Sequence, residues 1–69
     1  MEGRTYKIIE IVGTSEKSIE DAVANAVHEA QRTLKGLAWF EVREVRGGIK
    51  DGDITEFQVV TRIGFRLLE

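Results

Sequence analysis

The sequence contains no cysteine and a single histidine, His28. Without cysteine there is no disulfide, and one histidine with no cysteine partner does not provide the ligands of a structural zinc site. Acyl transfer needs a nucleophile, a base and a group that orients the base, and here the thiol is missing and the imidazole stands alone. We therefore expect no enzymatic activity and no metal, and we interpret His28 as a surface group.

Positive charge is not in excess either, since 12 acidic residues stand against 10 basic ones, giving a net charge of -2. A chain of this balance lacks the electrostatic footprint of a protein that binds nucleic acid or anionic lipid. No stretch approaches the ~18 apolar residues of a membrane span, and residues 1–5 lack the apolar core of a signal peptide. We expect a soluble, cytoplasmic protein that binds neither nucleic acid nor membrane.

Size is the third limit, because a chain of 69 residues forms one domain, taken here as residues 1–69. Such a chain buries only about 60% of its unfolded surface, so its stability margin is small. With no disulfide and no zinc, self-association is the remaining source of stability. We expect the chain to assemble with copies of itself.

The first half of the chain predicts a strand and then a helix. Residues 6–12 are rich in β-branched and aromatic residues and end at a turn over residues 13–15. An amphipathic helix follows from Ile19 to Leu34, with Ser15 or Ser18 as its cap and Gly36 closing it. The apolar or small residues that recur at helical spacing are Ile19, Ala22, Val23, Ala26, Val27, Ala30 and Leu34.

The second half predicts two strands, over residues 38–46 and 54–67, joined by a glycine-rich loop over residues 47–53. Alternation places two sets of side chains on opposite faces of the last strand. One face carries Phe57, Val59, Thr61, Ile63, Phe65 and Leu67, and the other carries Gln58, Val60, Arg62, Gly64 and Arg66.

The order of elements is therefore β-α-β-β, an α+β fold. The third strand runs antiparallel to the other two and must lie between them, in the order 1-3-2, with the helix on its apolar face. The opposite face has only mixed polar cover. At about 14 residues the third strand is long, so we expect part of it to pair or pack beyond its own subunit.

Three side chains on these strands could form a ligand site. Trp39, the only tryptophan, offers a stacking surface, and the Gln58 amide suits the imide edge of a planar heterocycle. Arg46 adds a positive charge that could meet a phosphate or stack on a ring. Alternatively, Trp39 anchors a core or an interface, Gln58 is solvated, and Arg46 belongs to a charged strand end.

Four motifs of this chain resemble one family, the dodecins, which are small flavin-binding proteins of bacteria and archaea. The motifs are IVGTSE at residues 11–16, WFEV at residues 39–42, EVRG at residues 44–47 and FQV at residues 57–59. Chain length, the alanine-rich helix and the order of elements agree with them, so the resemblance covers nearly the whole chain.

The resemblance implies a hollow homododecamer of tetrahedral symmetry, in which a three-stranded antiparallel sheet wraps around one helix in each subunit. Dodecins bind FMN, FAD, riboflavin or lumichrome in pairs at a two-fold axis. By resemblance, Trp39 and its symmetry mate enclose two isoalloxazine rings, and Gln58 hydrogen-bonds the ring edge. Arginine at position 46 is similar to the bacterial type, so FMN is the expected ligand and flavin storage with photoprotection the expected role.

A second candidate group consists of Arg4, Tyr6 and Arg66. Alternation puts Arg4 and Tyr6 on one face of the first strand, and antiparallel pairing brings Arg66 near them. Some bacterial dodecins carry a coenzyme A site, for which these residues are the candidates here. The alternative is a solvated basic edge.

Other functions have less support in the sequence. Glu41 and Glu44 lie three apart on a strand and are expected on opposite faces, which does not suit a paired acid and base. Gly47 and Gly48 lack the lysine and serine of a phosphate loop. The alternative function is a structural or partner-binding oligomeric module without flavin; a flavoenzyme is a third hypothesis, for which the sequence names no electron donor.

Overall fold

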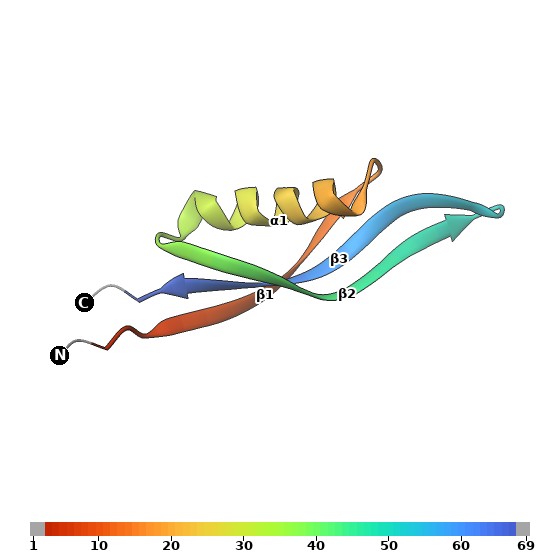
Figure 1. Ribbon diagram of the computed structural model, residues 1–69. Helices are drawn as coiled ribbons and strands as arrows, with labels where there is room; N and C mark the ends of the chain where they lie inside the picture. The colour runs from red at the N-terminus through yellow and green to blue at the C-terminus, as the bar shows by residue number, and fades with distance from the viewer. Residues whose placement is uncertain (1–2, 68–69) are drawn as a thin grey trace.

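A three-stranded antiparallel sheet carries one helix on one of its faces (Figure 1). The computed structural model describes residues 3–67, and its elements in chain order are β1 (Tyr6–Ser15), α1 (Ile19–Thr33), β2 (Leu37–Lys50) and β3 (Asp53–Arg66). The strand order is β1-β3-β2, with β3 antiparallel to both neighbours. The predicted α+β fold, its β-α-β-β order and its sheet order are confirmed.

Ser18 caps the helix, which decides between the two serines that the sequence left open. Its hydroxyl accepts a hydrogen bond from the backbone N–H of Asp21 at 2.9 Å. Ser15 instead donates to the Asp21 carboxylate at 2.7 Å and so ties the end of β1 to the first turn of α1. The helix ends where Leu34 donates to the Ala30 carbonyl, and Gly36 follows with φ of +76°.

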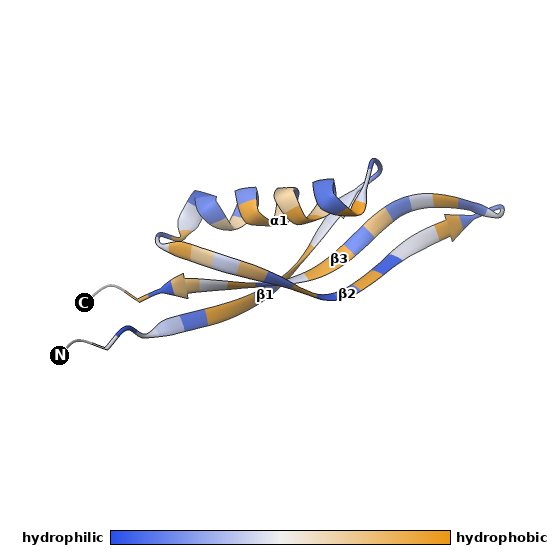
Figure 2. Ribbon diagram, in the orientation of Figure 1, coloured by the Kyte–Doolittle hydropathy of each residue, from blue (hydrophilic) through white to orange (hydrophobic). Residues whose placement is uncertain are grey.

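The core lies between α1 and the face of β3 that carries Val59, Thr61 and Ile63, which are 0%, 0% and 1% exposed. The buried side of α1 consists of Ala22, Val23, Ala26 and Ala30. Figure 2 shows the polar residues of α1 on its outer side. Alanine lets the helix approach closely, and a Cβ added to Gly13 would lie 2.0 Å from the Ala22 carbonyl oxygen.

The connection between β2 and β3 is shorter than predicted. The loop expected over residues 47–53 is wrong, because both strands continue and only Asp51 and Gly52 form the turn. Their φ angles are +53° and +84°, as in the type I′ turns that close hairpins. The strand β1 likewise runs on through Gly13 to Ser15. These glycines were taken as turn signals, but pairing with β3 keeps the backbone extended.

An irregularity in β2 changes which side chains share a face. Val42 pairs with Thr61 and Glu44 with Val60, so Arg43 is the extra residue of a β-bulge. The prediction that Glu41 and Glu44 lie on opposite faces is therefore wrong: Glu41 pairs with Arg62 and both glutamates lie on one face. A bulge shifts the alternation by one residue, which the sequence pattern does not reveal.

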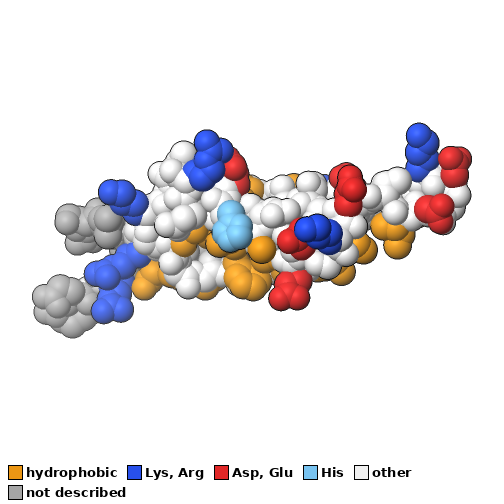
Figure 3. Space-filling view, turned by 90° about the horizontal axis from the view of Figure 1, so that it is seen from above, with side chains coloured by type: hydrophobic (Ala, Val, Ile, Leu, Met, Phe, Trp, Pro, Cys, Tyr) orange, Lys and Arg blue, Asp and Glu red, His pale blue; other side chains and the backbone are white. Residues whose placement is uncertain are grey.

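The helix does not cover the whole sheet. The β2–β3 hairpin extends past the first turn of α1, in a molecule that measures 57 × 20 × 13 Å (Figure 1). Several apolar side chains of β2 pair with the buried residues of β3 and yet remain exposed; these are Phe40, Val42 and Val45. Seen from the helix side, apolar side chains are visible along the flank of α1 (Figure 3). In residues 3–67 no helix has the length and hydropathy needed to cross a membrane.

Candidate functional site

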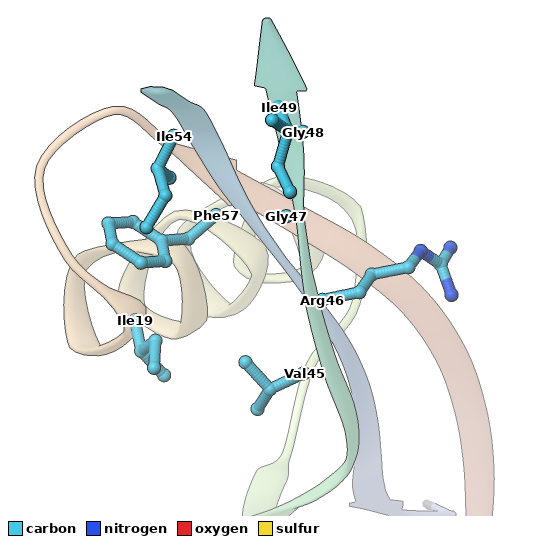
Figure 4. Close-up of a pocket in the computed structure, with 8 residues that line it drawn as sticks. All are labelled: Ile19, Val45, Arg46, Gly47, Gly48, Ile49, Ile54 and Phe57. Atoms are coloured by element: carbon cyan, nitrogen blue, oxygen red, sulfur yellow. The ribbon is translucent and has the colours of Figure 1, made fainter. Parts of the chain in front are cut away.

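The sheet face opposite α1, called the open face below, carries all three candidate residues of the first group. Trp39 pairs with Gly64 and Arg46 pairs with Gln58. On β3, Gln58 and Gly64 alternate with the core residues and so point away from the helix. Figure 4 shows the Arg46 side chain directed away from Val45, which faces the helix side. The predicted register, with Trp39 near the end of β3 and Arg46 near the hairpin, is confirmed.

The indole of Trp39 lies against the backbone of β3. Its six-membered ring occupies the space that a Cβ on Gly64 would take, since such an atom would lie 2.3 Å from two ring carbons. The Tyr6 ring flanks it, with centroids 5.0 Å apart and planes tilted by 53°. Trp39 nevertheless remains 42% exposed. The open face therefore presents an aromatic surface, the Trp39 ring, which packs on β3 at Gly64 and is flanked by Tyr6.

Sequence reasoning missed Gly64. A glycine inside a strand marks a close approach of another group, and that signal was available at this position.

Gln58 lies at the centre of a hydrogen-bonded network. Its Oε1 accepts from Arg46 Nε at 3.1 Å, and its Nε2 donates to Glu56 Oε2 at 2.7 Å. Arg46 Nη1 also pairs with Glu44 Oε2 at 3.0 Å. The guanidinium of Arg46 thus already contacts Gln58 and Glu44 of its own chain. A ligand phosphate would have to bind it alongside these two groups. Sequence reasoning missed Glu56, although its position two residues before Gln58 on the same face of β3 was a usable signal.

A row of paired charges separates Trp39 from this network. Arg43 Nη1 contacts Glu10 Oε2 at 2.9 Å, and Arg62 Nη1 contacts Glu41 Oε1 at 3.5 Å. The hydrogen bond and negative charge of Glu10 raise the pKa of Arg43.

Within one subunit the two halves of the expected flavin site do not meet. The β3 partners of Trp39 and Arg46 are Gly64 and Gln58, six positions apart in the strand. At about 3.3 Å per residue, this spacing corresponds to about 20 Å. One copy of the chain therefore offers the stacking surface and the amide in two separate places.

The second candidate group lies beside Trp39. Tyr6 pairs with Arg66 in the β1–β3 register and contacts the indole, while Arg4 precedes β1 and is exposed. The structure thus brings Tyr6 and Arg66 together, with Arg4 two residues before Tyr6 in the chain.

The helix side carries a pocket of a different character. An open hollow of about 260 Å³ lies under the hairpin, and its lining is mostly apolar (Figure 4). Ile19, Phe57 and Ile54 point into it, whereas Arg46 points to the open face. Within residues 3–67, no three acidic or histidine side chains gather to hold a metal ion.

These features define a small α+β protein, whose sheet holds an exposed tryptophan and an amide on the face not covered by its helix. The chain belongs to the dodecin family, since the Dodecin family model matches residues 5–68.

Individual relatives agree along nearly the full length. A dodecin from Thermus thermophilus is 49% identical over 67 residues, which are 97% of each chain. The solved structure of a dodecin from Streptomyces coelicolor is 49% identical with a TM-score of 0.94, covering 100% of this chain and 99% of its own. For a dodecin from Streptomyces davaonensis the identity is 46%, the TM-score 0.93, and the coverage 99% and 100%.

Proposed function

We propose that this chain stores flavin and protects the cell from its photochemistry, by holding the ring stacked on Trp39 in a hollow homododecamer. FMN is the expected ligand, with FAD, riboflavin and lumichrome as related ones, and residues 1–69 act as one cytoplasmic binding domain with no catalytic turnover. The observation that carries the proposal is the indole of Trp39, supported by Gly64 and still 42% exposed on the open face.

The site needs more than one copy of the chain. Because Trp39 and Gln58 lie about 20 Å apart along β3, a ring stacked on one tryptophan is beyond the reach of the amide in the same subunit. A two-fold axis supplies a second tryptophan and a second amide, so that two facing indoles enclose a pair of rings. A flavin stacked directly on Trp39 would be quenched by electron transfer from the indole followed by return of the electron to it, so light would cause no net reaction.

The proposal predicts the behaviour of Trp39→Ala. Loss of the stacking surface should abolish flavin binding while the assembly keeps its mass, because Trp39 faces away from the core. The measurement is a titration of ligand-free protein into FMN, followed by flavin fluorescence in every variant and by Trp39 fluorescence in the unmodified protein, with light scattering on the same samples. Trp39→Phe is the matched control, since it keeps an aromatic ring.

Two outcomes contradict the storage function. Unchanged FMN affinity in Trp39→Ala would show that the ring is bound elsewhere. Dissociation of the assembly by Trp39→Ala, together with bright, unquenched flavin beside the unmodified protein, would support the structural module without flavin.

We also propose a coenzyme A site formed by Arg4, Tyr6 and Arg66, a role favoured by the pairing of Tyr6 with Arg66. Two guanidinium groups and a phenol suit the phosphates and the adenine of that ligand. Arg66→Ala should weaken coenzyme A binding measured by calorimetry while riboflavin affinity is unchanged. Equal coenzyme A affinity in the variant would leave only a solvated basic edge.

A further inference from the structure

The Gln58 amide is held at both of its polar atoms by groups of opposite character. Arg46 can only donate hydrogen bonds and an ionised Glu56 carboxylate can only accept them. The two contacts are 3.1 Å at Oε1 and 2.7 Å at Nε2. Turning the amide over would set its N–H groups against the guanidinium and its oxygen against the carboxylate. Only one orientation of Gln58 therefore satisfies both neighbours.

This arrangement leaves a defined set of free positions on Gln58. A glutamine amide has two N–H donors and two acceptor lone pairs. Arg46 uses one lone pair and Glu56 uses one N–H, so one acceptor and one donor of the amide remain for a ligand. A cyclic imide offers the complementary pair, because its N–H lies next to a carbonyl oxygen.

The ion pair between Arg46 and Glu44 leaves the Glu56 carboxylate available to accept a hydrogen bond from Gln58. Arg46 takes Glu44 as its ion-pair partner, with Nη1 and Oε2 3.0 Å apart. Glu56 and Gln58 are two residues apart on β3, so alternation puts both side chains on the open face. Both residues are half-buried, which strengthens a charge-assisted hydrogen bond between them.

Resting on the proposed flavin site, we propose that Glu56 is a positioning residue that fixes the Gln58 amide to recognise an unsubstituted imide edge. In a flavin this edge is N3–H with an adjacent carbonyl: N3–H donates to Oε1 of Gln58, and Nε2 donates to the carbonyl oxygen. Glu56 acts through Gln58 and needs no contact with the ligand.

The first test is a double-mutant cycle with riboflavin, which has no phosphate to interact with Arg46. Glu56→Gln is isosteric and should weaken riboflavin binding about fivefold, because a neutral hydrogen bond replaces a charge-assisted one. In a Gln58→Ala background the same change should cost nothing. The control Glu29→Gln removes an equal charge from the helix surface, where Glu29 pairs with Arg32, and should leave the affinity unchanged.

The second test needs no variant and therefore does not depend on whether Glu56→Gln assembles. N3-methylriboflavin lacks the imide donor and should bind the unmodified protein at least about tenfold more weakly than riboflavin. Equal affinity for the two flavins would overturn the proposal.

The outcomes separate this inference from the proposed function. If the unmodified protein does not bind riboflavin, the flavin site itself is wrong. If riboflavin binds but Glu56→Gln has no effect, or weakens binding equally with and without Gln58, only the positioning role of Glu56 is overturned.

Discussion

At the scale of single residues, the position of the exposed Trp39 ring depends on the missing side chain of Gly64. The ring of Trp39 lies where a side chain at position 64 would begin, and Tyr6 flanks it at 5.0 Å between centroids. A ring held in this way loses little conformational freedom when a flat ligand stacks on it, so less of the interaction energy is spent on ordering. In the proposed flavin site, Gly64 would thus fix the indole in place for stacking.

Gly64→Ala tests this role. The added methyl group must displace the indole, which overpacks the site and should cost about 1–3 kcal/mol of stability. The proposed stacking geometry is lost with it, so riboflavin affinity should fall about tenfold or more. Fluorescence titration and urea denaturation measure the two effects. Gly3→Ala is the matched control, because a Cβ there meets nothing within 4 Å, and wild-type affinity in Gly64→Ala would contradict the expectation.

At the scale of elements, side chains at the start of the helix join it to the preceding strand. Ser18 satisfies the N–H of Asp21, and Ser15 holds the Asp21 carboxylate, so strand and helix are joined through one aspartate. The acidic residues Glu20 and Asp21 also complement the positive end of the helix dipole. The junction between β1 and α1 is therefore fixed by side chains close together in sequence.

Ser18→Ala should destabilise the protein by about 1 kcal/mol, because the N–H of Asp21 loses its acceptor. Ser18→Asp keeps an acceptor and should retain the stability of the unmodified protein. Chemical denaturation followed by circular dichroism compares the three proteins. A cap that contributes nothing would show as equal midpoints for Ser18→Ala and Ser18→Asp.

At the scale of the whole molecule, apolar surface is left without cover. The helix contacts β1 and β3 more than β2, and the exposed apolar residues on the helix side of the β2–β3 hairpin are Phe40, Val42, Val45, Ile49 and Ile54. The two isoleucines are 77% and 64% exposed. Contiguous apolar surface of this kind marks association sites, and a chain of 69 residues without cysteine has little other means of stabilisation. This surface supports the proposed assembly of copies.

Val45→Glu is expected to reduce the particle to smaller species, because an unpaired carboxylate would be buried where copies meet. Light scattering reports the mass. Gln31→Glu adds the same charge at an exposed position of α1 and should leave the particle intact. A Val45→Glu particle of unchanged mass would show that this surface faces solvent in the assembly.

The sequence by itself determined the order of the elements and most of the face assignments. Apolar spacing gave the helix from Ile19, and alternation gave the core face of β3 with Val59 and Ile63. The same alternation put Gln58 on the opposite face, and the order of strands put Trp39 beside the end of β3. These features follow from residues near one another in the chain, which is what periodicity reports.

Only the tertiary structure decided how the strands meet. Gly47 and Gly48 remain in β2 because β3 pairs with them, and the bulge at Arg43 moves Glu44 onto the open face. The contact of Trp39 with Gly64 and the two hydrogen bonds of Gln58 likewise depend on register across strands. The energy of pairing between strands far apart in sequence outweighs the local turn preference of glycine. A β-bulge shifts the alternation by one residue, so the side chains that follow it point to the opposite face from the one that the sequence pattern predicts.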